Sequence, residues 1–514
     1  MQTDDQHEAI AWLSDPATHG GEPVERVTTH AAMVFLAGDR ALKMKRAVRY
    51  DFMDFSTLDR RRVACEAEVR LNGRVAPRLY RRVLAVTRQP DGRLALGGPG
   101  EPVEWVVEMA RFDQEGLFDR LAAAGRLTTA CMTPLGHAIA ALHASAERTP
   151  GHGGSPGMSW VIEGNGTSCA ETPEDLVDRA ACRALLEASR TALAQVAVRL
   201  DRRQGEGFVR RCHGDLHLRN IVLLDDVPTL FDAIEFNDEI ACVDVFYDLA
   251  FLLMDLWRRQ LHAHANLVLH AYLEDTGDID GLALLPLFLS CRAAVRAKTS
   301  VVGLSGEADP ALRAEGAAIG AEYTALAQRF LRPERPRLVA IGGFSGTGKT
   351  SVARALAPGI GAAPGALVVR SDVIRKARHG VAPQVRLGAE AYTPAASRGV
   401  YETLGRQVAA VLQTGHTAVA DAVFATAEAR AAIEAVATAL GVPFTGLWLD
   451  APEDTLLARV AARRGDASDA DEAVVRSQVQ SDPGTLTWAR LDAGGALPDL
   501  LTRAWAVLAR DTHA

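Results

Sequence analysis

The chain of 514 residues is poor in lysine, has no long hydrophobic run and carries little net charge. Only five of its 56 basic residues are lysines. Because arginine is used at most basic positions, a retained lysine indicates a position that needs a compact ammonium and that a planar guanidinium does not fit. The most apolar stretch, residues 241–257, is interrupted by Asp244, Asp248 and Asp255, so we expect no membrane-spanning helix. The N-terminus is acidic and lacks a basic start followed by an apolar segment, so we expect no secretory signal.

The seven cysteines are odd in number and include no C-x-x-C pair. We therefore expect reduced thiols in a cytoplasmic protein, with neither a disulfide framework nor a zinc site. Net charge is −8; 18 Lys+Arg and 17 Asp+Glu lie from residue 337 onward, which leaves 38 and 47 before it. Neither half has the strongly basic field of a nucleic-acid-binding protein, which argues against a nucleic-acid partner.

The predicted elements change in character along the chain. Up to about residue 112 they are mostly strands, with a hairpin around Gly38 and one helix, and from 113 to 330 they are mostly helices. A stretch rich in Gly, Ser and Pro at 150–172 predicts an exposed insertion. The two prolines of residues 331–336 predict a linker. From 337 to 514 strands and helices alternate, which predicts a parallel sheet with helices on both faces.

A glycine-rich loop follows the first strand of the second domain. The run GFSGTGKT fits G-x-x-x-x-G-K-[ST] between an apolar strand and an alanine-rich helix. In this pattern backbone N–H groups wrap the phosphates, the lysine reaches the β- and γ-phosphates and the hydroxyl binds Mg²⁺. The candidate nucleotide ligands are Gly343, Ser345, Gly346, Thr347, Gly348, Lys349, Thr350 and Ser351, with Thr350 also a candidate magnesium ligand.

Three further features of the second domain have the chemistry of phosphoryl transfer. Asp372 follows the second strand, where a carboxylate can accept a proton from an incoming hydroxyl, and Arg375 lies one turn later. Asp421 ends the third strand and is a second candidate magnesium ligand, or else a helix N-cap. Arg459 and Arg463 share one face of a predicted helix, which is either a mobile lid over the phosphate or an ordinary solvated face.

Over about 337–495 these residues resemble the P-loop kinases of the gluconate kinase, zeta toxin and polynucleotide kinase group. That resemblance implies an α/β P-loop NTPase domain at 337–514. It makes Asp372 the candidate base and Arg375 an acceptor or phosphate ligand. It makes Arg459 and Arg463 the lid arginines.

A second motif, HGDLHLRN, lies at 213–220 and is followed by FDAIE at 231–235. An aspartate close to a downstream asparagine, with another aspartate at a strand end, supplies what ATP-dependent transfer needs. Asp215 would act on the acceptor hydroxyl, while Asn220 and Asp232 would hold Mg²⁺. The motif resembles the catalytic loop of aminoglycoside phosphotransferases and choline-kinase-like enzymes, which are relatives of protein kinases.

This second resemblance spans roughly 25–300 and implies an α+β, protein-kinase-like bilobal domain at 1–330, with an N-lobe to about 112. It matches Asp248 to a structural aspartate below the catalytic loop. It places the phosphate-binding lysine at Lys43, with Lys45 in reserve on the same strand face. The partner carboxylate is then Glu68 in preference to Glu66, and the hinge that binds adenine lies near Met109 and Ala110. No G-x-G-x-x-G loop precedes these residues.

The order of motifs also resembles a bacterial family usually labelled bifunctional aminoglycoside phosphotransferase/ATP-binding protein, a label that does not establish an antibiotic substrate. We favour a bifunctional kinase, with ATP and Mg²⁺ in both domains, that phosphorylates hydroxyl groups of small molecules. One alternative keeps a single active kinase domain with a nucleotide-dependent regulator or ATPase, and another makes the P-loop domain a 5′-hydroxyl nucleic-acid kinase.

His217, Arg292 and Arg296 favour an anionic acceptor, unless the two arginines pair with carboxylates. Oligomeric state stays open.

Overall fold

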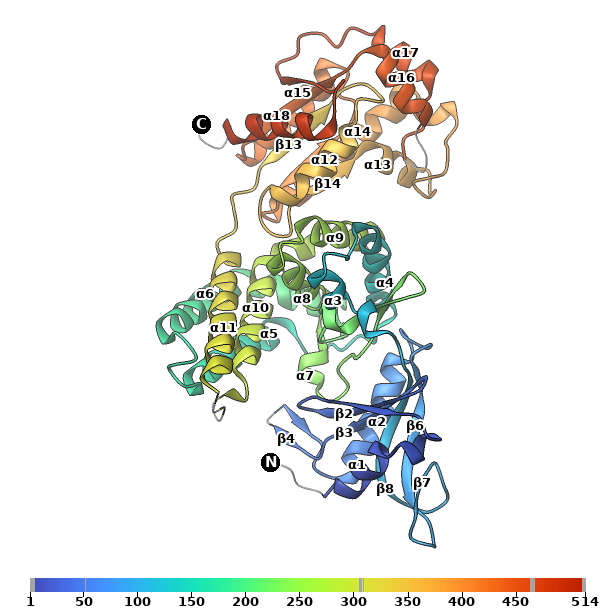
Figure 1. The fold of residues 1–514 in the computed structure, drawn as a ribbon. Coiled ribbons are helices and arrows are strands. Elements are labelled where there is room, and N and C mark those ends of the chain that lie inside the picture. The colour runs from blue at the N-terminus through green and yellow to red at the C-terminus, as the bar shows by residue number, and fades with distance from the viewer. Residues whose placement is uncertain (1–4, 51, 305–306, 308, 463–466, 511–514) are drawn as a thin grey trace. The chain divides into compact units, whose positions relative to one another are not determined.

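The computed structural model describes residues 5–50, 52–304, 307, 309–462 and 467–510 (Figure 1). By packing, the chain divides into two compact units, residues 1–259 with 291–317 and residues 260–290 with 318–514. The segment predicted as a linker lies between α11 (Pro310–Phe330) and β13 (Leu338–Gly342), and a domain boundary at that segment stays a prediction. Among the described helices, none is both long and apolar enough to cross a bilayer.

The first unit begins with a six-stranded antiparallel sheet of order β1-β2-β3-β8-β6-β7. Its strands are β1 (Val24–Thr28), β2 (Ala32–Ala37), β3 (Arg40–Lys45), β6 (Tyr80–Arg88), β7 (Leu94–Leu96) and β8 (Glu101–Ala110). Helix α2 (Leu58–Asn72) packs along β6 and β8 and starts at Thr57, whose hydroxyl accepts the N–H of Arg60. The predicted hairpin and the predicted helix are therefore both present.

Strand β3 has two buried faces, because the sheet packs on both sides. Leu42 and Met44 enter an apolar cluster with α1 (His7–Ser14), while Ala41 enters the cluster against α2. Alternation along the strand then puts Lys43 and Lys45 on the face that carries Ala41. Both lysines thus point toward α2 and not toward the apolar cluster on the other face.

The rest of the first unit is helical, with two short hairpins. Helix α8 (Val245–Arg258) is buried along nearly its whole length, so the most apolar stretch of the sequence is a core helix. The hairpin of β10 (Ile221–Leu224) and β11 (Val227–Leu230) follows the catalytic-loop motif. The other elements are α3 (Phe118–Ala123), α4 (Met132–Ser145), α5 (Gly154–Glu171), α6 (Arg179–Glu206), β9 (Val209–Arg211), α7 (Asp238–Ala241), β12 (Cys242–Asp244) and the chain's α10 (Leu285–Val301).

Two expectations about this region are wrong. Residues 150–172 contain helix α5 rather than an exposed insertion, because Met158 and Ile162, four residues apart, are buried on one helix face. Its glycines allow close packing: a Cβ at Gly166 would lie 2.9 Å from a side-chain carbon of α6. The two helices also bring Cys169 and Cys182 together as a disulfide, so the cysteines are not all reduced thiols.

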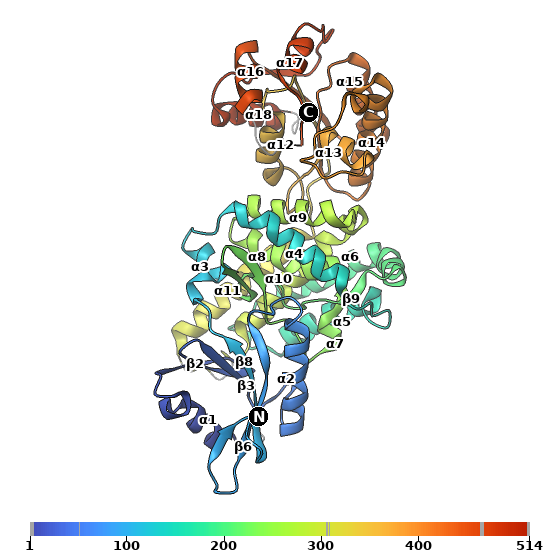
Figure 2. The same cartoon turned by 90° about the vertical axis from the view of Figure 1, so that its right-hand side faces the viewer.

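The second unit contains a five-stranded, all-parallel sheet of order β14-β15-β13-β16-β17. The strands besides β13 are β14 (Leu367–Arg370), β15 (Ala418–Asp421), β16 (Phe444–Asp450) and β17 (Ala489–Asp492). Figure 2 shows α12 (Lys349–Leu356) and α18 (Leu497–Arg510) on one side of this sheet and α14 (Pro394–Gln413) and α15 (Ala427–Leu440) on the other. The predicted parallel sheet with two helical layers is confirmed, although its fifth strand, β17, was not predicted.

Candidate active sites

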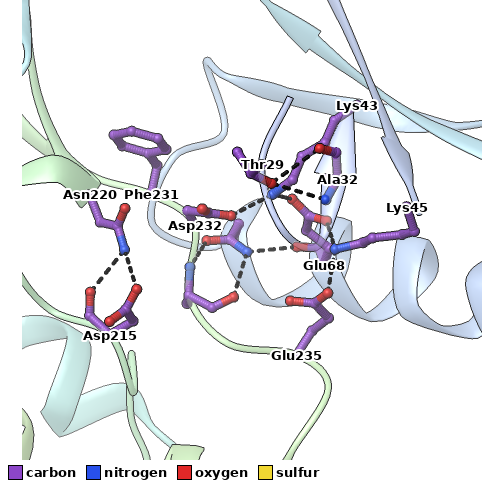
Figure 3. A network of polar contacts seen from close by, with 12 residues as sticks. Thr29, Ala32, Lys43, Lys45, Glu68, Asp215, Asn220, Phe231, Asp232 and Glu235 are labelled. Atoms are coloured by element: carbon purple, nitrogen blue, oxygen red, sulfur yellow. Dashed lines mark hydrogen bonds and ion pairs between the residues drawn. The ribbon is translucent and has the colours of Figure 1, made fainter. Parts of the chain in front are cut away.

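The first site is built around a buried carboxylate that two lysines share (Figure 3). Lys43 Nζ lies 2.7 Å from Glu68 Oε1 and 2.5 Å from Asp232 Oδ1. Burial alone would raise the pKa of Glu68, but Lys43 and Lys45 outweigh it and lower that pKa to about 2. Burial opposes the charge of Lys43 as well, yet Asp232 and Glu68 hold its pKa well above the ordinary value. Both groups are therefore charged at neutral pH.

The second lysine of the strand completes the cluster. Lys45 Nζ lies 2.5 Å from Glu68 Oε2 and also pairs with Glu235. The structure thus brings both candidate lysines to Glu68, but of the two it is Lys43 that pairs with Asp232. The alternative partner, Glu66, lies on the outer face of α2, where it pairs with an arginine of the same helix.

Asp215 and Asn220 lie on the other side of Asp232, as Figure 3 shows. Asn220 Nδ2 donates to the backbone oxygen of Asp215 at 2.9 Å and to its Oδ2 at 3.0 Å. The N–H of Phe231 donates to the Asn220 carbonyl at 3.0 Å, which ties Asn220 to the strand end before Asp232. Burial would raise the pKa of Asp215, but His217, with Nε2 at 3.3 Å, lowers it overall. Asp215 is therefore a carboxylate at neutral pH.

The backbone of this site is held by buried polar groups. Asp248 Oδ1 accepts the N–H of Gly214 at 2.8 Å, and its Oδ2 accepts the N–H of His213 at 3.2 Å. Arg292, predicted as an acceptor ligand or a partner of carboxylates, is buried and pairs with a carboxylate, with its Nη2 3.8 Å from Asp248 Oδ1. It also donates to the carbonyl of Gly214 at 3.2 Å. Arg292 therefore stabilises the backbone of the catalytic-loop motif. Asp232 itself has a φ of 62°, a left-handed conformation that costs a non-glycine residue about 1–3 kcal/mol and is typical of functional sites.

The predicted hinge lies at the end of β8 beside an apolar cluster. Met109 is buried in this cluster together with Ala41, Val222 and the partly buried Phe231. The N–H of Ala110 donates to the carbonyl of residue 79 at 2.8 Å, so in this structure it is already used. The role of Met109 and Ala110 in binding adenine stays a prediction.

A tight turn replaces the glycine-rich loop of the first site. The N–H of Thr29 donates to the carbonyl of Ala32 at 2.9 Å, and the N–H of Ala32 donates back to the Thr29 hydroxyl at 3.0 Å. The turn joins β1 to β2 without any glycine. It is closed by a threonine side chain instead, a local bond that serine and threonine commonly make in turns.

In the second unit, residues 343–348 join β13 to α12 and have the backbone expected of a phosphate loop. Gly343, Gly346 and Gly348 have φ angles of 137°, 90° and 86°, which favour glycine. A Cβ at Gly343 would lie 2.4 Å from a backbone oxygen of β16, so the close approach also requires glycine. The N–H of Ser345 donates at 2.8 Å to Oε1 of Gln478, on α17 (Glu472–Val479), and Lys349 Nζ donates to the carbonyl of residue 344 at 3.0 Å.

The candidate metal ligands of this loop lie together. Thr350 Oγ1 donates to Asp421 Oδ2 at 2.6 Å. Arg370, at the end of β14, lies 3.4 Å from the same oxygen and also donates to the Thr350 hydroxyl. Burial raises the pKa of Asp421 despite the nearby cations Lys349 and Arg370. Asp421 is not the N-cap of the next helix, α15, because Thr426 takes that position.

The remaining predicted residues of the second unit are less closely grouped. Asp372 lies on α13 (Ser371–Arg378), near enough to Asp421 for its charge to help raise the Asp421 pKa. Arg375 is buried, donates to the carbonyl of residue 391 at 2.5 Å and lies over the ring of Tyr392. Arg459 donates to the carbonyls of residues 493 and 495. Arg463 lies outside the described residues, so both lid arginines stay predictions.

Sequence reasoning missed several residues that the structure brings to these sites. They are Asn72, Tyr80 and Glu235 in the first unit and Arg370 and Gln478 in the second. Glu235 had a usable signal, since it closes the FDAIE motif three residues after Asp232. The other four have no motif of their own and are brought in by tertiary packing.

Comparison with known proteins gives the family of the chain. The model of the phosphotransferase enzyme family matches residues 49–285, and that of an AAA domain matches residues 338–481. Uncharacterised proteins of two Mycobacterium tuberculosis strains and of Mycobacterium bovis are 30% identical over 476 residues, which is 91% of this chain and 92% of each relative.

Solved structures similar to parts of the chain are also kinases by title. A choline/ethanolamine kinase family protein of Mesorhizobium loti is 17% identical, with 65% of this chain and 98% of the other covered and a TM-score of 0.40. An aminoglycoside phosphotransferase of Streptomyces rimosus is 18% identical, with coverages of 62% and 98% and a TM-score of 0.30. A gluconokinase of Sinorhizobium meliloti is 22% identical, with coverages of 34% and 94% and a TM-score of 0.26.

The two family matches define an enzyme of the kinase-type phosphotransferase class, whose families use ATP. The chain belongs to the family of the mycobacterial proteins above. Within this chain, an aminoglycoside-phosphotransferase-like domain precedes a P-loop kinase domain. The expected fold class, a protein-kinase-like domain followed by an α/β P-loop domain, is thereby confirmed.

The role of Asp248 gives a stability prediction. Asp248→Asn keeps the side-chain size but replaces a carboxylate that accepts two N–H groups and lies 3.1 Å from His143 Nε2. We expect the unfolding free energy of the first unit to fall by about 3 kcal/mol, measured by urea denaturation followed by circular dichroism. The exposed Asp59→Asn is the control and should stay within about 0.5 kcal/mol of wild type. Equal effects of the two substitutions would contradict a bracing role.

Proposed function

We propose that the protein is a bifunctional, ATP- and Mg²⁺-dependent kinase of small molecules, in which each domain transfers the γ-phosphoryl group to an acceptor hydroxyl. One observation carries the proposal: each unit gathers its own phosphate lysine, its own oxygen ligands and its own acceptor carboxylate. In the first unit these are Lys43, Asn220 with Asp232, and Asp215. The second unit has an equivalent set in Lys349, Thr350 with Asp421, and Asp372.

The residues of the first site fit a magnesium ion. Mg²⁺ prefers oxygen ligands, and Asp232 and Asn220 supply a carboxylate and an amide oxygen at adjoining strand ends. Because Asp215 binds Nδ2 of Asn220, the amide oxygen of Asn220 is turned away from Asp215, as Figure 3 shows. When bound between Asp232 and the amide oxygen of Asn220, Mg²⁺ would neutralise charge that develops on the phosphates.

The first head would transfer phosphate by positioning its reactants. Lys43, held by Glu68, binds phosphate oxygens, and Asp215 orients the acceptor hydroxyl. As the acceptor oxygen bonds to the γ-phosphorus and the bond to the ADP oxygen breaks, the hydroxyl proton passes to Asp215. Because the pKa of Asp215 is lowered, it is a weak base, so its main contribution is orientation until the proton becomes acidic.

The second head would follow the same scheme with different parts. Loop N–H groups between Gly343 and Ser351 cradle the phosphates, and Lys349 turns from the carbonyl of residue 344 toward them. Asp372 takes the acceptor proton. Thr350 and Asp421, whose Oγ1 and Oδ2 atoms lie 2.6 Å apart, would hold Mg²⁺.

A second candidate function keeps the P-loop unit as a nucleotide-dependent regulator or ATPase. It is favoured by Arg375 and Arg459, both of which are bound to backbone carbonyls rather than presented to an acceptor or to phosphate. In that case only the first domain would transfer the phosphoryl group. A nucleic-acid kinase has no such support, because the second domain carries 18 Lys+Arg against 17 Asp+Glu from residue 337 onward.

A metabolite panel tests the proposal. Wild type should release ADP in response to hydroxyl acceptors, while Lys43→Ala and Lys349→Ala should each abolish the response to a different acceptor or to one step on the same acceptor.

Asp215→Asn should lower transfer by the first head by a factor on the order of 10² or more and leave Mg·ATP binding nearly unchanged. If transfer stayed within about tenfold of wild type, the role of Asp215 would be wrong. If Lys349→Ala affected no acceptor, the regulatory function would be favoured.

The scarcity of lysine gives a further prediction. Lys43→Arg and Lys349→Arg should each disable one head although charge is kept, because a longer planar guanidinium does not fit among phosphate oxygens. Lys298→Arg, which matches no phosphate motif, is the control and should be nearly silent in the same assays. Equal tolerance at the three positions would refute the argument that lysine is retained for its shape.

A further inference from the structure

We propose that Lys45 is a positioning residue that holds Glu68 and helix α2 against residues 232–235, which we call the metal-binding segment. Lys43 can then bind phosphate. We call the arrangement the Lys45 bridge: the Lys45 ammonium with the carboxylates of Glu68 and Glu235. It rests on the proposed function of the first site. It goes beyond that function by assigning a role to the second lysine and to Glu235.

The bridge is too deeply buried to be a surface ion pair. The side chains of Lys45, Glu68 and Glu235 are 4%, 0% and 4% exposed. A buried charge without a partner is strongly unfavourable, and here the Lys45 ammonium is paired with two carboxylates, with Oε2 of Glu68 at 2.5 Å. The other oxygen of Glu68 is used by Lys43, which links the bridge directly to the phosphate lysine.

A second tie connects the same two elements. The N–H of Ala233 donates to Asn72 Oδ1 at 2.7 Å, and Asn72 Nδ2 lies 3.4 Å from the Ala233 carbonyl. Asn72 is the last residue of α2, one turn after Glu68. Helix α2 is therefore attached to residues 232–235 through two side chains, one at each of two successive turns. The helix cannot move away from the metal-binding segment unless both attachments and the Glu68–Lys43–Asp232 contacts break.

The bridge divides the work between the two lysines. Lys43 pairs with both Glu68 and Asp232, so if Asp232 turns to a metal ion, Lys43 still has Glu68 to hold it in place. Lys45 is saturated by two carboxylates, and its ammonium also lies 5.3 Å from the ring centre of Phe55. The Lys45 ammonium is therefore not available to bind phosphate. Its effect on the reaction passes through Glu68, which makes it a positioning residue and not a catalytic one.

The test uses the full chain in a Lys349→Ala background, so that only the first site binds nucleotide. The Lys45→Met/Glu235→Gln variant removes the bridge and replaces both charges with neutral groups of similar size. We expect its affinity for Mg·AMP-PNP, measured by calorimetry, to fall by about tenfold or more. The matched control is Arg61→Met/Glu104→Gln. It removes another buried ion pair between α2 and the sheet, in which Arg61 Nε lies 2.9 Å from Glu104 Oε1. This pair includes no residue of the metal-binding segment.

The control separates positioning from stability. It should lower the melting temperature as much as the bridge variant does, yet leave Mg·AMP-PNP affinity within about twofold of the background chain. If the two variants lost affinity equally, or if neither did, the bridge would be an ordinary core ion pair and the proposal would be overturned. If the double variant does not fold, Glu235→Gln alone is measured against the same control and by the same criterion.

A measurement on the wild-type chain needs no variant. Cys65 lies on α2, one turn before Glu68, and is fully buried, so its labelling by iodoacetamide reports any outward movement of the helix. Peptide mapping should find Cys65 labelled no faster than the buried Cys212 and Cys291, both with and without Mg·AMP-PNP. Labelling of Cys65 that is about tenfold faster in the free chain would show a mobile helix and overturn the proposal.

The proposed function can fail separately from the bridge. If the Lys349→Ala chain bound no Mg·AMP-PNP, the first head would not be a nucleotide site, and the proposed function would be wrong. The labelling of Cys65 relative to Cys212 and Cys291 would still decide whether α2 is locked.

Discussion

The first site depends on one buried carboxylate, Glu68, held between two ammonium groups. Its two oxygens lie 2.7 Å from Lys43 Nζ and 2.5 Å from Lys45 Nζ. Without these cations burial would raise its pKa and neutralise it, and both lysines would lose their anchor. Through the two lysines this carboxylate links α2 to β3 and to residues 232–235. These ion pairs are present without a ligand, and groups held in place in advance are what electrostatic catalysis requires.

The two units solve one problem with different structures. In the first, a lysine on an antiparallel strand is fixed by carboxylates from a helix and from a strand end. In the second, three glycines with positive φ shape the backbone of the proposed phosphate loop, and the lysine is the first residue of α12. Each unit supplies a polar pair that we propose as metal ligands, and neither set includes a residue of the other.

Residues within a short motif could be predicted from the sequence. The HGDLHLRN and GFSGTGKT motifs fix both the residue types and their spacing, and the structure places Asp215 with Asn220 and Thr350 with Asp421. Alternation along β3 also placed both lysines on one face. What the sequence could not give was which lysine would pair with Asp232, because that choice depends on Glu68 and Asp232 meeting across 164 residues of chain (232 − 68).

The errors have physical causes of the same kind. Glycine, serine and proline lower helix propensity, so 150–172 resembled a loop, yet burial of Met158 and Ile162 against α6 overrides the local preference. The disulfide between Cys169 and Cys182 follows from that same helix pair, and no spacing rule indicated it. Strand β17 is only four residues long and gains its order by pairing with β16.

The central claim is that one chain carries two independent nucleotide sites. Calorimetric titration of the full chain with Mg·AMP-PNP tests it most directly, with Lys43→Ala and Lys349→Ala as single-site variants. The account predicts two nucleotides bound per wild-type chain and one in each variant, because the two ligand sets share no residue. A single nucleotide in wild type that disappears in Lys349→Ala would contradict the account, since the lysine–carboxylate cluster around Glu68 would then not be a nucleotide site.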